Sequence, residues 1–142
     1  MKGTHLAMAV VAAAAAAFLA TPSYATHTQS MGGISYWEGV EQGIPVVSGG
    51  VGLDERAAMT EIQRDYDLKL EFAMKNGEYV SDVKVDIQDG KGMPVLEEVT
   101  HGPWFFAKLP AGEYKVMVSF EGRTEMRDFK VGNGLQTHVF YW

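Results

Sequence analysis

The chain has 142 residues, with 12 basic and 18 acidic side chains, a formal net charge of −6 and no cysteine. An acidic surface repels phosphate instead of releasing counterions from it, which argues against a nucleic-acid or anionic-lipid partner. The lack of cysteine excludes disulfides, thiol nucleophiles and thiolate metal sites, so packing alone must hold the fold together.

Residues 1–25 have the pattern of a cleaved signal peptide. Lys2 gives a positive start, residues 6–20 form an apolar run, and Ser23 and Ala25 offer small residues at a cleavage site. The run is shorter than the roughly 20 residues of a membrane span, and no later segment is apolar enough to cross a bilayer. The alternative is an uncleaved anchor, which the many alanines disfavour. Cleavage after Ala25 leaves one domain of 117 residues with a net charge of −7, expected in the periplasm or outside the cell.

Residues 26–53 are rich in glycine and serine and show no sustained period of 2 or 3.6. We interpret them as a loop-like lead-in with one short extended piece at residues 44–47. Tyr36 and Trp37 are its large aromatic residues. They either anchor the lead-in on the domain or form an exposed platform for a ligand, because aromatic residues are enriched at binding surfaces.

Residues 54–66 predict a short helix. Asp54 is a suitable N-cap, and Glu55 follows in the first turn, where the helix dipole favours an anion. Met59, Ile62 and Tyr66 are spaced to build one apolar stripe. We expect this stripe to cover an end or edge of the strands that follow, in preference to binding a partner.

In residues 67–142 apolar side chains recur at every second position. Leu68, Leu70 and Phe72 alternate with charged residues, and residues 82–88 and 113–120 alternate in the same way. One face of each strand is then buried and the other is wet. Turn dipeptides separate about seven short strands, so we expect a mainly β fold, a seven-stranded antiparallel sandwich of the prealbumin or immunoglobulin-like kind with one short N-terminal helix.

The alternation breaks once, in the strand expected at residues 124–131. Met126 falls on one face of that strand, whereas Phe129 and Val131 fall on the other. A β-bulge near Arg127 and Asp128 would absorb the extra residue.

Residues 105–131 carry a motif of an aromatic residue, Leu-Pro-x-Gly-x-Tyr, an alternating strand and a glycine turn. Pro110 presets φ for a tight turn, Gly112 accepts a positive φ, and Tyr114 points inward. This motif resembles the transthyretin-like, or carboxypeptidase-regulatory-like, β-sandwich family. The resemblance covers residues 67–142 and implies the fold, whereas members of the family serve as stalks, docking modules or sugar-binding appendages. The whole chain also resembles a group of small exported bacterial proteins, which implies no mechanism.

Catalytic and metal motifs are weak in this sequence. There is no Gly-x-Ser-x-Gly elbow, and the neighbouring carboxylates Glu97 and Glu98 point to opposite faces of one strand. His101 and His138 are weak metal candidates, because neither has a second histidine at ligand spacing. We expect no metal and no other cofactor.

The sequence therefore favours an exported, non-catalytic binding or accessory module that contacts a protein or a glycan. Its contact surface would include Tyr36, Trp37 and Trp104 together with edge strands. The alternative is a small hydrolase or metal-binding protein that uses His101, His138 and nearby carboxylates. Self-association through an edge strand is a third hypothesis.

Overall fold

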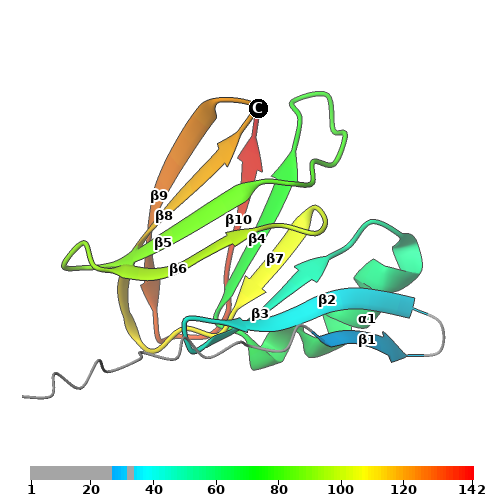
Figure 1. The fold of residues 1–142 in the computed structure, drawn as a ribbon, viewed down its shortest axis with the longest axis horizontal. Coiled ribbons are helices and arrows are strands. Elements are labelled where there is room, and N and C mark those ends of the chain that lie inside the picture. Colours follow the sequence, from blue (N-terminus) through cyan, green and yellow to red (C-terminus); the bar gives the residue numbers. More distant parts are fainter. Residues whose placement is uncertain (1–26, 32–33) are drawn as a thin grey trace, which may run out of the picture.

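The computed structural model describes residues 27–31 and 34–142, so the signal peptide predicted at residues 1–25 lies outside the described residues. Within them the chain forms a helix α1 (Leu53–Ile62), one turn of 3-10 helix η1 (Gln63–Asp65) and two β-sheets (Figure 1). The strands are β1 (His27–Met31), β2 (Ile34–Glu41), β3 (Ile44–Gly49), β4 (Leu68–Ala73), β5 (Lys84–Asp89), β6 (Pro94–Val99), β7 (Trp104–Ala107), β8 (Gly112–Phe120), β9 (Arg123–Val131) and β10 (Gln136–Tyr141). None of the helices in this part of the chain is long and apolar enough to span a membrane.

The larger sheet has the order β1-β2-β3-β7-β4-β10, and the smaller sheet has the order β6-β5-β8-β9. The sequence prediction of seven antiparallel strands is therefore wrong in number, because β1, β2 and β3 extend the larger sheet. It is also wrong for one pair, since β10 lies parallel to β4 from Gln136 opposite Leu68 to Tyr141 opposite Ala73. The mainly β character, the two sheets and the single short α-helix are confirmed.

The described residues within the predicted lead-in at residues 26–53 do not form a loop. They supply three strands, of which the extended piece expected at residues 44–47 is the start of β3. The missing alternation has a physical cause in β3, where Val46 and Val47 are both buried although they point to opposite faces. A strand covered on both faces shows no period of 2.

The main core lies between the two sheets. Leu70, Phe72 and Phe105 of the larger sheet meet Val85 and Val116 of the smaller one, and all five are fully buried. The alternation predicted for residues 82–88 and 113–120 is confirmed by Val85, Ile87, Val116 and Val118, which face this core.

A second core lies on the other face of the larger sheet, under α1. Met59 is fully buried there, with Phe106 and Trp104 beside it and Ile62 and Tyr66 packed at its side. The helical stripe predicted from the sequence is thereby confirmed. Burial raises the pKa of Tyr66 to about 12, and the nearby Glu38 carboxylate acts in the same direction.

The second core also corrects the expectation that the charged face of β4 is wet. Lys69 is buried, with its Nζ 3.8 Å from the centre of the Trp104 ring and 3.0 Å from Glu71 Oε1. Its remaining polar contact is the Gln63 Oε1 atom at 3.4 Å. The cost of burying the Lys69 ammonium group is offset by its contacts with an aromatic ring and a carboxylate.

Two local predictions are also corrected. The helix N-cap is Gly52 and not Asp54, which lies with Glu55 in the first turn. No bulge occurs near Arg127, because β8 and β9 pair in continuous register from Phe120 opposite Arg123 to Gly112 opposite Val131. The phase slip instead reflects the exposure of β9, whose residues 123–128 are all exposed and need no apolar alternation.

The segment before β8 shows two features of the predicted motif, the inward Tyr114 ring and the positive φ of Gly112. The Tyr114 hydroxyl donates a hydrogen bond to the Pro110 carbonyl oxygen at 2.6 Å, and the Tyr114 ring is buried in the main core. Gly112 has a positive φ of 158°. These contacts fix the turn against the end of the sandwich.

Candidate functional site

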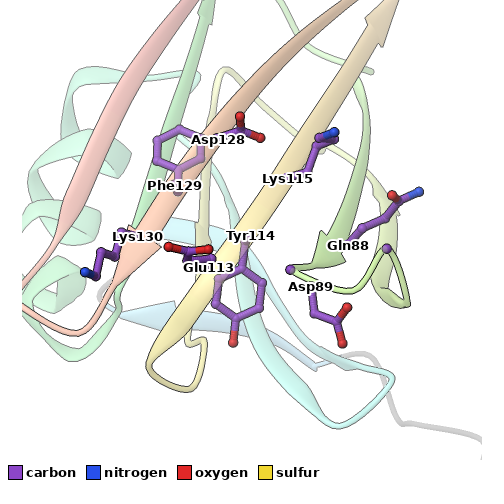
Figure 2. Close-up of a pocket in the computed structure, with 10 residues that line it drawn as sticks. Gln88, Asp89, Glu113, Tyr114, Lys115, Asp128, Phe129 and Lys130 are labelled. Carbon is purple, nitrogen blue, oxygen red and sulfur yellow. The ribbon is translucent and has the colours of Figure 1, made fainter.

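A hollow of about 520 Å³ lies at one end of the smaller sheet, over β5, β8 and β9 (Figure 2). The strand register puts Lys115 between Gln88 and Asp128, and it puts Glu113 opposite Lys130. These five side chains alternate with buried residues such as Val116, so they belong to the face of the sheet that points away from the main core. The lining residues are Gln88, Asp89, Gly90, Gly92, Glu113, Tyr114, Lys115, Asp128, Phe129 and Lys130.

The rim of the hollow is rigidly built. Asp89 Oδ1 accepts hydrogen bonds from the backbone N–H groups of Lys91 and Met93, both at 2.9 Å. The backbone of Asp89 closes the same turn, donating to the Met93 carbonyl and accepting from Gly92 N. Asp89 Oδ1 therefore holds the turn in place.

A second hollow of about 480 Å³ continues the first around the tip of the sandwich. It shares Asp89, Gly90, Glu113 and Tyr114 with the first and adds Lys91, Ala111 and Gly112. The groove therefore reaches from the outer sheet face to the turn that Tyr114 fixes.

The two adjoining hollows together carry balanced charge, because Lys91 at the turn offsets the Asp89 carboxylate. Glu113 and Asp128 supply carboxylate acceptors, Lys115 and Lys130 supply ammonium donors, and Gln88 supplies both. Such a surface suits a polar ligand with several hydroxyl or amide groups and gives no net preference for an anion. The side chains come from three strands, which position binding groups more firmly than loops do.

The aromatic residues singled out from the sequence lie elsewhere. Tyr36 and Trp104 are only 5% and 9% exposed and belong to the core under α1. Burial raises the pKa of the Tyr36 hydroxyl, and the Glu38 carboxylate raises it further. Both residues thus anchor the larger sheet and offer little surface to a ligand.

Trp37 is the most exposed of the three, but it is partly buried against the main core and one face of its ring is covered. His101 stacks on it with the ring centres 4.7 Å apart, and Gly39 leaves room for the indole on its own strand. The loop that carries His101 is held to β3, since the His101 N–H donates to Ser48 Oγ at 2.8 Å. Trp37 and His101 therefore join the loop before β7 to β2.

His138 lies in a different part of the fold. Its ring meets Phe140 edge-on at 4.7 Å and Phe129 at 6.1 Å, and burial lowers its pKa, with the Arg127 charge adding to the effect. Three strands, β3, β7 and β4, separate β10 from the β2 strand on which His101 stacks. The structure thus does not bring the two histidines together. Among residues 27–31 and 34–142, no group of three metal-ligating side chains is close enough to hold a metal ion.

Glu98 is a partly buried carboxyl group on the core-facing side of β6, a position that was not predicted as a candidate site. Glu98 shares the inward face of β6 with the buried Leu96, and its pKa is raised by burial and by the Glu41 carboxylate of β2. The backbone N–H of Val99 donates to Glu98 Oε1 at 2.8 Å and partly offsets this rise in the pKa. A glutamate at a core-facing position of an alternating strand was the available sequence signal.

Replacing Glu98 with glutamine is expected to stabilise the protein more at about pH 7 than at about pH 4. A carboxyl whose pKa is raised in the folded state favours folding below its unfolded pKa. That contribution is lost as the pH rises through the folded pKa. The exposed neighbour Glu97 is the matched control, because its hydrogen bond and charge contact with Lys84 lower its pKa. Urea unfolding measures the free energy of unfolding of Glu98→Gln and Glu97→Gln at both pH values. From about pH 4 to about pH 7, the difference from the wild type should rise for Glu98→Gln and fall for Glu97→Gln. The same pH dependence for both variants would contradict the assignment.

No protein-family model and no curated protein sequence matches this chain.

Proposed function

We propose that this chain is an exported, non-catalytic binding module that holds a glycan of the cell envelope in the hollow of the smaller sheet. The observation that carries the proposal is the preformed groove with charge-balanced lysine, carboxylate and amide groups on three adjacent strands. Sugars present many hydroxyl groups that both donate and accept hydrogen bonds, and this set of side chains matches them without requiring net charge.

Residues 1–25 serve as a cleaved signal peptide, which gives a mature chain starting at Thr26 in the periplasm or outside the cell. The sandwich is of the prealbumin or immunoglobulin-like kind, which the motif around Pro110, Gly112 and Tyr114 supports. Modules of this kind act by binding, and the sites that decide their roles are added to the scaffold.

A hydrolase or metal centre that uses His101 and His138 together has less support. His101 is stacked on Trp37, and His138 is packed between Phe129 and Phe140 on a distant strand. Neither ring shares a cavity with the other, so a reaction that needs both would require a different fold of the chain.

Photo-crosslinking in living cells tests this function. A photoreactive amino acid is placed at Lys115 in the hollow, and at the exposed Glu61 of α1 as the control, in the full chain expressed with its N-terminal segment. We expect a glycan adduct at position 115 and none at position 61. The intact mass of the recovered protein should match a chain that begins at Thr26.

Each other outcome is decisive. A protein adduct at position 115 would replace the glycan with a protein ligand. Equal labelling at positions 115 and 61, or no adduct at either, would overturn the hollow as the binding site. A recovered chain that retains residues 1–25 would overturn the proposed cleavage.

A further inference from the structure

The smaller sheet ends at β9, whose outer backbone edge has no paired strand among the described residues, although Phe129 near its C-terminal end contacts His138 of β10. In the described part of the chain β9 pairs with β8 alone, and Figure 1 shows it as the terminal strand of its sheet. Residues 123–128 are all exposed, and Met126 is 60% exposed. A strand of nine residues with one free edge presents a row of unpaired backbone donors and acceptors.

The side chains of β9 determine which strand can pair with it. Thr124, Met126 and Asp128 share the outward face, because they lie opposite Ser119, Met117 and Lys115 of β8. Arg123, Glu125 and Arg127 lie on the other face, opposite Phe120, Val118 and Val116. Inward-pointing charges on an edge strand discourage pairing with an arbitrary partner, because each charge would be left without an opposite one.

We propose that the partner of this edge is β9 of a second copy of the chain, paired antiparallel about a twofold axis at Met126. In this register Glu125 of each copy faces Arg127 of the other, which gives two ion pairs on the inward face. Met126 faces its own counterpart, and Thr124 faces Asp128. The charges of Glu125 and Arg127, which another strand would leave unpaired, thereby neutralise each other, whereas Arg123 lies opposite Phe129 at the end of the pairing.

Neighbouring registers are excluded by the same charges. A twofold axis perpendicular to the sheet keeps outward residues opposite outward residues. Each allowed register therefore has one residue of β9 on the axis, and the neighbouring registers place the adjacent residues there. Centring the pair on Arg127 places two arginines face to face, and centring it on Asp128 places two aspartates face to face. Of the registers that use most of β9, the one centred on Met126 avoids every like-charge pair.

The arrangement has a structural consequence. The two smaller sheets would join into one continuous sheet, and both hollows would lie on the same face of it, because the axis keeps the outward faces together. Asp128 of each hollow would stand next to Thr124 of the other copy. The pairing itself rests on β9 alone and holds whether or not the hollow binds a glycan.

Cysteine crosslinking tests this pairing, because the chain has no cysteine of its own. Met126→Cys in the full chain would bring two thiols together across the axis, with Cα atoms about 4.5–5.5 Å apart, within disulfide range. Thr124→Cys would leave its two thiols about 13 Å apart, too far to bridge. We expect Met126→Cys to form covalent dimers at least about tenfold faster than Thr124→Cys under mild oxidation.

Two further variants make the result specific. A mixture of Thr124→Cys and Asp128→Cys chains should form a disulfide-linked mixed dimer, because positions 124 and 128 face each other across the pairing. Either variant alone should form few covalent dimers. Adding Glu125→Arg to Met126→Cys should abolish the crosslink, and adding Arg127→Glu as well should restore it. Equal crosslinking at positions 126 and 124, or a crosslink that ignores the charge reversal, would overturn the proposal.

Discussion

Replacing Phe106 with alanine is expected to lower the free energy of unfolding by about 3–5 kcal/mol. Phe106 lies on β7 with its side chain fully buried on the face of the larger sheet that α1 covers. Its ring lies 5.7 Å from the Tyr66 ring and 6.2 Å from the Trp104 ring. Removing it would leave a cavity between helix and sheet that these rigid aromatic neighbours cannot fill.

Urea unfolding of Phe106→Ala measures this loss directly. Phe105→Ala, on the opposite face of the same strand, should be destabilising to a similar degree because it removes a ring from the main core. Met93→Ala, at an exposed position outside β9, should stay within about 0.5 kcal/mol of the wild type. If Phe106→Ala behaved like Met93→Ala, the face of the larger sheet under α1 would not be a core.

Alternation predicted the strands that border water on one side. Residues 113–120 lie in β8 with Val116 and Val118 inward, and residues 84–88 lie in β5 with Val85 and Ile87 inward. Period 2 is informative there because one face meets the other sheet and the opposite face meets solvent.

The same rule failed where both faces are covered. Val46 and Val47 are adjacent and both buried, so the larger sheet loses its period at β3. Lys69 sits at a position that alternation assigns to water, yet it contacts the Trp104 ring under the helix. The sequence pattern of one strand does not show that a helix from another part of the chain will cover it.

The candidate site was beyond sequence analysis for a different reason. Gln88, Lys115 and Asp128 lie next to one another through the pairing of three strands. Each is an ordinary polar residue on the wet face of its own strand, and only the register between strands makes them neighbours. Tyr36 and Trp104 are predicted as contact residues because aromatic residues are enriched at interfaces. Large aromatic side chains are more often buried in a core, and both of these lie in the second core.

The strands β3, β7 and β4 of the larger sheet are covered on both faces, whereas the outer face of the smaller sheet is open to solvent and is the surface proposed to bind. Thiol labelling tests it, since each introduced cysteine is the sole one in the chain. Val47→Cys places a small apolar thiol on the helix-covered face of the larger sheet, where Val47 is fully buried. Lys115→Cys places one in the hollow of the smaller sheet.

We expect the thiol at position 115 to react as fast as a free thiol, and the one at position 47 to react at least about a thousandfold more slowly, since exposing it requires unfolding that costs about 5 kcal/mol or more. Both should react equally fast in urea. Rapid labelling of the native protein at position 47, or protection at position 115, would contradict the assignment of covered and open faces.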